Sequence, residues 1–188
     1  MKKALVFFVV LAFGACKEIS FREPQPIGRR SLPSIPKKLH GQYLTFMENG
    51  DLSNDTIIIS SRGYRFGYFD QGPQSDHREN YEMGVLSDSL VFKSYHGYYF
   101  LNLFQNPEWL LRVIKQEKNG DLIYMAMEQE NVDFNNYVNK LSKEIRIDSI
   151  KNEKETLYHI RPGPKQLIGL IEKGFFSKTV LKRIVKNE

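Results

Sequence analysis

Residues 95–109 read YHGYYFLNLFQNPEW and form the densest aromatic run in the chain. In an extended strand, alternate side chains point to opposite faces. One face of a strand over 98–104 therefore carries Tyr98, Phe100, Asn102 and Phe104, and the other carries Tyr99, Leu101 and Leu103. Both faces are rich in apolar groups, which predicts a strand that is buried on both sides.

Three roles for this strand stay open at this point. Its side chains fill a core, line a pocket inside a barrel, or form an exposed patch that docks another protein. The candidate residues for a ligand or partner surface are Tyr98, Phe100, Phe104 and Trp109.

Short apolar runs separated by turn residues surround this strand and predict an antiparallel meander. The expected strands are 42–47, 56–61, 64–69, 82–86, 89–94, 98–104, 109–117 and 122–128. A tight type I′ turn is expected at Asn119-Gly120, because this pair tolerates positive φ. Eight strands in this order predict an up-and-down barrel or a strongly curved sheet.

Two of the expected hairpins share a pattern. DTIIISSRGYRFGYF, from Asp55, and DSLVFKSYHGYYFLNLF, from Asp88, both run Asp-[Thr/Ser], three apolar residues, any residue and Ser, and then Gly-Tyr-x-Phe. Each is expected to form a strand–turn–strand unit with Gly63 or Gly97 at the bend. An internal repeat and a chance likeness of two hairpins both explain the pattern.

The periodicity changes after residue 128. Phe134, Tyr137, Val138 and Leu141 fall on one helix face, and Asp133 is placed to cap its first turn. The runs 145–150 and 156–160 predict another hairpin. A short helix is expected around 167–171, ended by Gly174. For the last segment, 177–186, the spacing favours a small helix capped by Ser177, with a strand as the alternative.

The order of strands followed by helices is similar to that of lipocalin-like domains. Gly41-Gln42-Tyr43 resembles the Gly-x-Trp that opens the first strand of that family, with Tyr in place of Trp. The resemblance implies a mainly β fold, an antiparallel meander or barrel with short C-terminal helices, and a carrier of a small apolar ligand.

The chain begins MKKALVFFVVLAFGAC, with two lysines followed by an apolar stretch over 4–15. This is the layout of a secretory signal. Twelve helical residues span roughly 18 Å, which is short of the about 30 Å hydrocarbon core of a bilayer. Gly14 and Ala15 precede Cys16, the single cysteine of the chain.

This pattern resembles a bacterial lipobox, with Phe13 where Leu is usual. The resemblance implies cleavage before Cys16, acylation of Cys16 and a membrane anchor, because several acyl chains hold a protein stably to a bilayer. The chain also looks like the small lipoproteins of Bacteroidota, many of which have no assigned activity. Lys17 is not the Asp that commonly retains lipoproteins at the inner membrane, so the expected location is the outer membrane, with the leaflet undetermined.

The expected domain organisation has three parts. Residues 1–15 form a lipoprotein signal peptide, and residues 16–38 form a lipidated tether. Residues 39–188 form a single β-rich domain with C-terminal helical segments. The tether is expected because 17–38 holds Pro24, Pro26, Pro33 and Pro36, half of the eight prolines in the chain, and proline neither donates nor fits a helix interior.

Charge excludes a nucleic-acid partner. Two of the 27 basic residues lie in the first three positions, and the others nearly balance the 22 acidic ones. Charges of both signs are scattered along the chain, whereas nucleic-acid binding favours a concentrated basic stripe.

No catalytic or metal-binding motif is present in the sequence. The four histidines, His40, His77, His96 and His159, do not have the spacing of metal ligands. The chain has no nucleophile-elbow motif and no phosphate-binding glycine loop. No catalytic residue, metal ligand or cofactor is therefore predicted, although Ser, His and Asp residues distant in sequence can meet in a fold.

Three triplets resemble the Asp-Ser/Thr-apolar sites that Bacteroidota use for O-glycosylation. They begin at Asp55, Asp88 and Asp148 and make Thr56, Ser89 and Ser149 the candidate acceptors. Turn residues that lead into a strand give the same triplets without any sugar, so both interpretations stay open.

The sequence thus predicts a lipid-anchored, non-catalytic binding or scaffolding module of the cell envelope. Its expected partners are the membrane, through Cys16, and other envelope proteins or a small apolar ligand. A lipocalin-like carrier and an envelope hydrolase are the alternatives.

Overall fold

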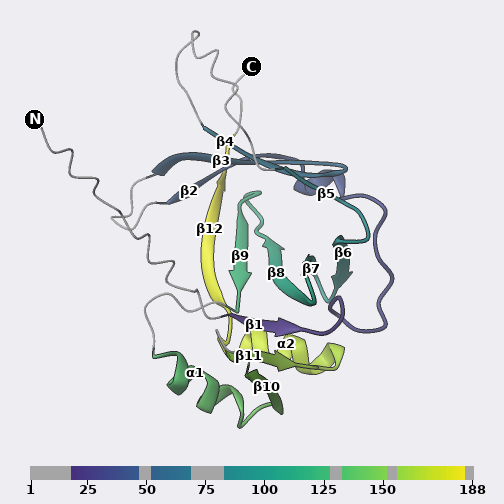
Figure 1. Ribbon diagram of the computed structural model, residues 1–188. Coiled ribbons are helices and arrows are strands. Elements are labelled where there is room, and N and C mark those ends of the chain that lie inside the picture. Colours follow the sequence, from purple (N-terminus) through teal and green to yellow (C-terminus); the bar gives the residue numbers. More distant parts are fainter. Residues whose placement is uncertain (1–17, 47–51, 69–82, 128–132, 152–155, 185–188) are drawn as a thin grey trace, which may run out of the picture.

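The computed structural model describes residues 18–46, 52–68, 83–127, 133–151 and 156–184. In these residues a largely antiparallel, 12-stranded sheet bends around an interior, and helices lie at one end (Figure 1). The strands are β1 (Ile19–Phe21), β2 (Gly41–Phe46), β3 (Leu52–Ser60), β4 (Gly63–Tyr68), β5 (Met83–Val85), β6 (Leu90–Tyr95), β7 (Tyr98–Gln105), β8 (Glu108–Gln116), β9 (Leu122–Ala126), β10 (Ile147–Lys151), β11 (Thr156–Ile160) and β12 (Ser177–Arg183). The helices are the short 3₁₀ turn η1 (Lys37–Leu39), α1 (Phe134–Leu141) and α2 (Pro164–Glu172). The prediction of a mainly β, antiparallel fold with short C-terminal helices is confirmed.

The stretch 95–109 forms the centre of the β6–β7–β8–β9 meander. Tyr95 pairs with Tyr98 across the two-residue loop His96-Gly97. His96 (φ 50°) and Gly97 (φ 79°) both have positive φ, which is the geometry of a type I′ turn.

The predicted type I′ turn at Asn119-Gly120 is wrong, because of these two residues Gly120 alone has positive φ, at 90°. The last β8–β9 pair is Gln116 with Leu122, so the loop spans 117–121 and is too long for a two-residue turn. The additional length places the Asp121 carboxylate against Lys182 and the backbone of Arg183.

Strand β12 carries the sheet from the first meander to a second one. Ser177–Leu181 pair with β9, and Lys182 and Arg183 pair with β2. Figure 1 shows β12, in yellow, rising from the helices to β2. The predicted small helix over this segment is wrong and the strand alternative holds, because both parts of the segment meet strands with which they hydrogen-bond. The sheet continues through β3 and β4 to β5.

The sheet is not closed into a barrel. Among the described residues β5 and β6 do not pair with one another. Residues 29–36, named the strap here, lie beside this opening (Figure 1). Leu32 N–H donates to Phe92 O of β6 at 2.7 Å, and Ile35 N–H donates to Ser61 O at the β3–β4 turn at 2.8 Å. The strap therefore joins the two halves of the sheet.

The tether prediction is wrong for residues 18–38. Strand β1 pairs with β11 in parallel and with β8 antiparallel, and Ile19 and Phe21 are fully buried. The proline-rich part that follows is also bound, because side chains supply the hydrogen bonds that a strand partner would. Asn102 accepts from Gln25 N–H at 2.6 Å and donates to Gln25 O at 2.9 Å.

Lys93 holds the same proline-rich segment. Its Nζ donates to Pro24 O at 2.7 Å and to Pro26 O at 3.2 Å. Burial lowers the pKa of Lys93, and the nearby charge of Glu23 opposes that effect. The apolar residues Ile35 and Leu39, farther along, are buried as well. The folded domain thus begins before residue 39.

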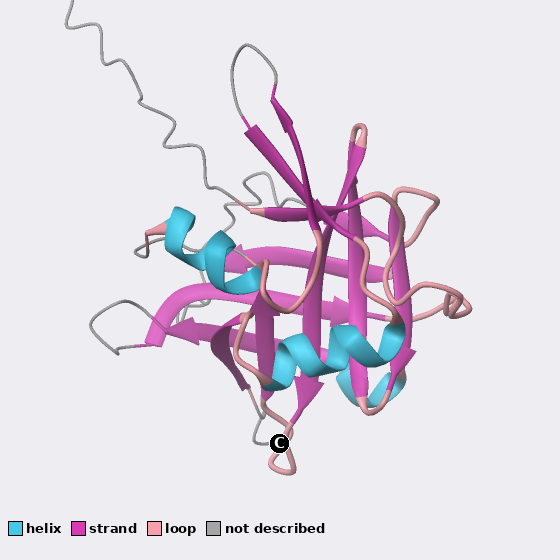
Figure 2. Ribbon diagram, turned by 90° about the horizontal axis from the view of Figure 1, so that it is seen from below, coloured by secondary structure: helices cyan, strands magenta, loops and turns pink. Residues whose placement is uncertain are grey.

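The described residues between 133 and 172 form two helices and a hairpin, as predicted. The Asp133 side chain caps α1 by accepting from Asn135 N–H and Asn136 N–H. The helix buries Phe134, Tyr137 and Leu141, and Tyr137 donates to Phe175 O at 2.9 Å. Burial raises the pKa of Tyr137. Figure 2 shows the helices lying across the strands.

Two separate groups of buried side chains lie on opposite faces of the meander. The helix-covered core contains Phe100, Leu111, Val113 and Met125 together with residues of α1, α2, β1 and β11. The strand-enclosed core contains Leu101, Ile114 and Leu122 together with residues of β2, β3, β6, β12 and the strap. The alternation predicted for 98–104 is confirmed, since Phe100 and Leu101 are neighbours in sequence and belong to different cores.

Candidate ligand-binding cavity

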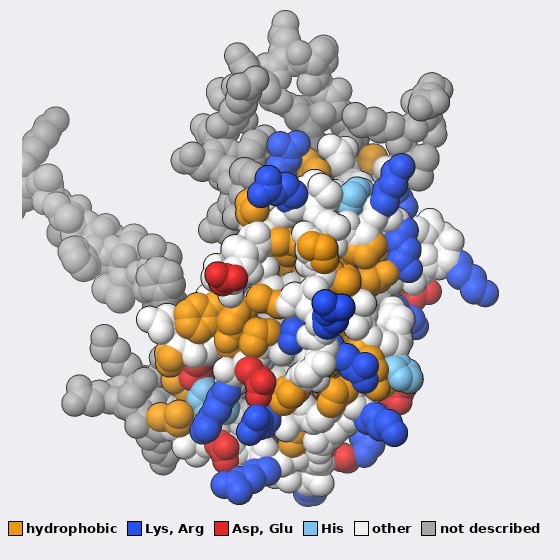
Figure 3. Space-filling model, turned by 90° about the vertical axis from the view of Figure 1, so that its right-hand side faces the viewer, with side chains coloured by type: hydrophobic (Ala, Val, Ile, Leu, Met, Phe, Trp, Pro, Cys, Tyr) orange, Lys and Arg blue, Asp and Glu red, His pale blue; other side chains and the backbone are white. Residues whose placement is uncertain are grey.

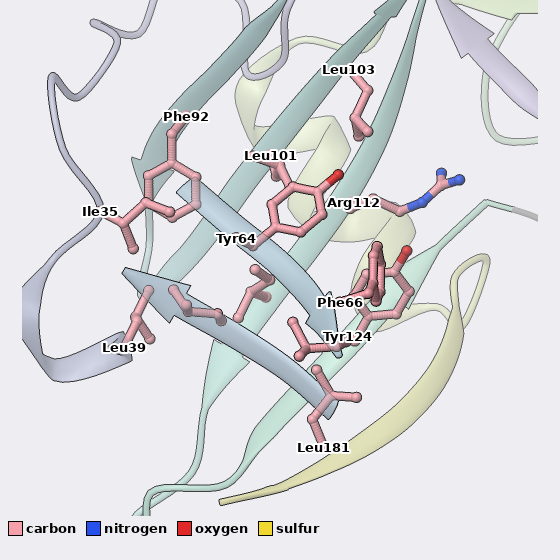
Figure 4. Close-up of a pocket in the computed structure, with 13 residues that line it drawn as sticks. Ile35, Leu39, Tyr64, Phe66, Phe92, Leu101, Leu103, Arg112, Tyr124 and Leu181 are labelled. Atoms are coloured by element: carbon pink, nitrogen blue, oxygen red, sulfur yellow. The ribbon is translucent and has the colours of Figure 1, made fainter. Parts of the chain in front are cut away.

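The strand-enclosed core is incompletely filled. A cavity of about 220 Å³ lies inside it. Its walls come from β3, β4, β6, β7, β8, β9 and β12, and from the strap and η1 at the open side of the sheet (Figure 4). Most of its lining side chains are aliphatic or aromatic; Ile59, Phe92, Leu101, Ile114 and Leu181 are examples.

One part of the lining reaches solvent. Phe66, which lines the cavity from β4, is 42 % exposed. Its ring meets that of Tyr64 edge-on, with centroids 5.6 Å apart. Figure 4 shows Tyr64, Phe66 and Tyr124 among the side chains that line the cavity. We place the mouth of the cavity at Phe66.

Among the described residues that line the cavity, Arg112 is the one with a charge. It lies on β8 opposite Leu101, and its stem contributes to the wall. Its guanidinium forms a two-point ion pair with Glu18, in which Nη1 contacts Oε1 and Nη2 donates to Oε2 at 3.1 Å. The side chains of Arg112 and Glu18 are only 15 % and 11 % exposed.

A polar cluster joins β1, β8 and β11. Ser20 Oγ contacts a carboxylate oxygen of Glu108 and lies 3.1 Å from Nδ1 of His159. Nε2 of His159 lies 2.8 Å from the other Glu108 oxygen, although the two groups are not aligned for a hydrogen bond. No local pattern in the sequence indicates this set, because Glu108 and His159 are 88 and 139 residues from Ser20.

The same residue types perform nucleophilic catalysis in serine hydrolases. Here Ser20, Glu108 and His159 are 3 %, 8 % and 4 % exposed. All three side chains are therefore largely shielded from solvent in the described structure. Through the Ser20 hydroxyl the cluster ties β1 to β8 and β11, while Nε2 of His159 is buried without a hydrogen bond.

The four residues predicted to form a ligand or partner surface do not all lie at the surface. Phe100 is fully buried in the helix-covered core, and Tyr98 packs against that core. Phe104 is 41 % exposed and lies against Trp109, with ring centroids 5.1 Å apart. None of the four lines the cavity, which is on the opposite face. In sequence, the alternate residues Leu101 and Leu103 marked that face.

The candidate acceptors for sugars differ in exposure. Thr56 is 3 % exposed, between β2 and β4, so a sugar cannot be attached there in the folded domain. Ser89 and Ser149 are exposed. Cys16 lies outside the described residues.

The three histidines within the described residues lie in separate places. His40 contacts Ile35 O at 2.8 Å, His96 is in the type I′ turn and His159 is in the buried cluster. His77 lies outside the described residues. In the part of the chain that the structure describes, no three His, Cys, Asp or Glu side chains are grouped to hold a metal ion.

Surface charge and helix length add two observations. The face crossed by the strap carries patches of apolar side chains with Lys and Arg scattered between them (Figure 3). Within the described ranges, none of the helices has the length and apolar character needed to cross a bilayer.

Comparisons with known proteins give no relatives. No family model, no curated protein and no solved structure matches this chain.

Proposed function

We propose that this protein is a non-catalytic binding protein that holds a small apolar molecule in the strand-enclosed cavity. The observation that carries the proposal is an apolar space of about 220 Å³, walled by seven strands, with a partly exposed aromatic residue at its mouth. Apolar cavities of about 150 Å³ stay dry and take up benzene or xenon. The space therefore suits a ligand of up to roughly nine non-hydrogen atoms, scaled from benzene.

The volume also limits the class of ligand. Pockets for drug-sized molecules span about 300–1,000 Å³. A two-chain lipid or a large ring system exceeds this cavity, whereas a single aromatic ring or a short alkyl chain fits. Ligands of this size bind with affinities in roughly the micromolar to millimolar range.

A binding experiment with 1-heptanol tests the proposal. We expect heptanol to raise the melting temperature and to give a saturable titration by calorimetry, because it binds the folded state alone. In Leu101→Phe the larger ring occupies the cavity, so binding is lost while the fold is kept.

Val180→Phe is the matched control. Val180 is 40 % exposed on β12, and its enlargement leaves the cavity unchanged. Equal binding to wild type and Leu101→Phe, or no binding to wild type, contradicts the proposal.

We also propose that lipid on Cys16 holds the protein at the outer membrane of the cell envelope. Glu18, which directly precedes β1, lies only two positions after Cys16. Two residues reach at most about 7 Å. A lipid anchor at Cys16 would therefore hold the domain against the bilayer and not at the end of a long tether.

Cys16→Ser tests the anchor. The variant should be released as a soluble protein or remain an unprocessed precursor. Retention of a correctly processed Cys16→Ser protein in the membrane fraction contradicts the lipid anchor.

A second candidate function is docking to another envelope protein. It is favoured by the exposed ring of Phe104, which lies against the partly buried Trp109. Phe104→Ser should abolish site-directed cross-linking from this surface in native membranes and leave heptanol binding intact. Unchanged cross-linking in Phe104→Ser contradicts the docking function and leaves the ligand-binding function as the supported one.

A further inference from the structure

One row of side chains crosses the sheet on its helix-covered face and remains open to water. Residues that pair directly opposite one another in antiparallel strands have their side chains on the same face. Tyr95 pairs with Tyr98, Tyr98 with Lys115, Lys115 with Ile123, and Ile123 with Val180. These residues, named the belt here, run across β6, β7, β8, β9 and β12.

The belt lies next to the helix-covered core. Phe100, Val113 and Met125 occupy the same face two positions along β7, β8 and β9, and they are buried in that core. In the belt, the Lys115 side chain is 48 % exposed and Val180 is 40 % exposed. The other belt members, two tyrosines and an isoleucine, pack against the core and are partly exposed. The belt is therefore an amphipathic surface at the border of a filled core.

Basic side chains surround the belt. On β12, Lys178 and Lys182 are each two positions from the belt valine and lie on its face, and both are exposed. The Arg29 guanidinium lies over the ring of a belt tyrosine, 4.2 Å from the centroid. With the belt lysine these are four basic groups, against two carboxylates: Glu117 lies 4.0 Å from the belt lysine, and Asp121 binds Lys182. Among the described residues this surface thus has a net positive charge.

The chain enters the domain beside the β12 end of the belt. Ile19 N–H donates to Met127 O at 3.2 Å, and the neighbouring Ala126 pairs with Ser177, the first residue of β12. In Figure 1 the lower end of β12, in yellow, lies beside the start of β1. Cys16 is three positions before Ile19, a reach of at most about 11 Å. A lipid on Cys16 therefore enters the bilayer close to the exposed face of β12.

Resting on the lipid anchor proposed above, we propose that the belt and the lysines of β12 form the surface that faces the bilayer and binds its anionic phospholipid headgroups. Lysine stems lie along apolar surface while their ammonium groups reach the phosphates. Tyrosine is favoured at the level of the headgroups, because its ring is apolar and its hydroxyl is polar. Each basic side chain close to an anionic bilayer strengthens binding by about fivefold.

The experiment labels a single thiol on the lipidated protein, reconstituted into vesicles of equal parts phosphatidylcholine and phosphatidylglycerol. Because lipid occupies Cys16, the new thiol of Val180→Cys is the one that a fluorophore can label. We expect nitroxide-bearing lipid headgroups to quench this label and to leave the label in Val85→Cys unquenched. Val85 is the matched control, since it is the same residue type, is 44 % exposed, and lies on β5 at one end of the strand order.

A charge variant tests the headgroup contact. Lys178→Gln, added to Val180→Cys, should lower the population of protein whose belt touches the bilayer by about fivefold, measured as weaker quenching. Vesicles of phosphatidylcholine alone should weaken quenching in the same way. Lys37→Gln is the control and should leave quenching unchanged, because Lys37 is exposed on η1, which receives a hydrogen bond from Gln116 on the other face of β8.

The outcomes separate this inference from the anchor. Equal quenching of the labels at positions 180 and 85 overturns the assignment of the face and leaves the lipid anchor standing. Unchanged quenching in Lys178→Gln, or in vesicles without phosphatidylglycerol, overturns the binding of anionic headgroups. If the wild-type protein does not float with the vesicles, the anchor and this inference fail together, and heptanol binding by the cavity is unaffected by that result.

Discussion

The two faces of the β7–β8–β9 meander border two interiors that are packed differently. On one face, Phe100, Leu111 and Met125 meet side chains of α1 and α2 and of the strands around them. On the other face, Leu101, Ile114 and Tyr124 line a cavity of about 220 Å³. The same strands supply both faces, so the difference lies in what covers them. Helices can shift to bring side chains together, whereas a sheet that curves back on itself is held apart by its own hydrogen bonds.

The largest expected effect is on the helix-covered side. Phe100 is fully buried, so Phe100→Ala should lower the free energy of unfolding by about 3–5 kcal/mol through lost transfer energy and a new cavity. Chemical denaturation measures the change in the free energy of unfolding. Tyr99→Ala is the control on the other face, where Tyr99 is partly exposed and stacks on Phe92 with centroids 5.6 Å apart. If neither substitution changes stability, the strand is not a core strand.

A matched pair of leucines sharpens the comparison. Leu111→Ala, in the helix-covered core, should cost about 3–4 kcal/mol, within the usual range for such truncations. Leu101→Ala should cost at least about 1 kcal/mol less, because a side chain that borders empty space has fewer packing partners to lose. Equal losses would show that the two interiors are packed alike.

At Asp121, on the edge of the strand-enclosed side, we expect a smaller effect on stability that depends on pH. Burial acts to raise its pKa, but hydrogen bonds from Lys182, from the Arg183 backbone and from Asn119 outweigh burial, so the pKa lies below its ordinary value of 3.8. A carboxyl with a lowered pKa stabilises the fold above its unfolded pKa and loses that contribution as pH falls through the folded value.

Asp121→Asn should therefore be less stable than wild type by about 1 kcal/mol near pH 7, since Lys182 is partly exposed and screened. The difference should shrink as the pH falls below about 3.8. Melting curves across pH 2.5–7 measure it, roughly the range over which carboxylates titrate. A constant difference at all pH values would exclude this role for the carboxylate.

Local patterns in the sequence predicted local structure well. Alternation in 98–104 assigned Phe100 and Leu101 to opposite faces, and Asp133 was correctly placed as a cap. Proline content misled the prediction for 18–38, because the hydrogen bonds that hold this segment come from distant side chains such as Lys93 and Asn102. Spacing alone did not separate helix from strand over 177–183, where the pairing partners decided.

The cavity itself had no local signature. Its described lining comes from seven strands, the strap and η1, and each contributes one or two residues that are mostly apolar. The Glu18–Arg112 pair spans 94 residues and could not be read from spacing. Empty space depends on how closely the elements approach one another, which sequence periodicity does not report.

Xenon binding measured by methyl NMR tests the central claim most directly. Xenon enters dry apolar cavities without requiring a specific ligand. We predict saturable shifts for the methyl groups of Ile59, Leu101, Leu103 and Ile114, and none beyond the general solvent effect for Leu111, Val113 and Met125. Shifts of equal size on both faces, or the absence of saturable shifts on the cavity face, would contradict the account of one filled and one hollow interior.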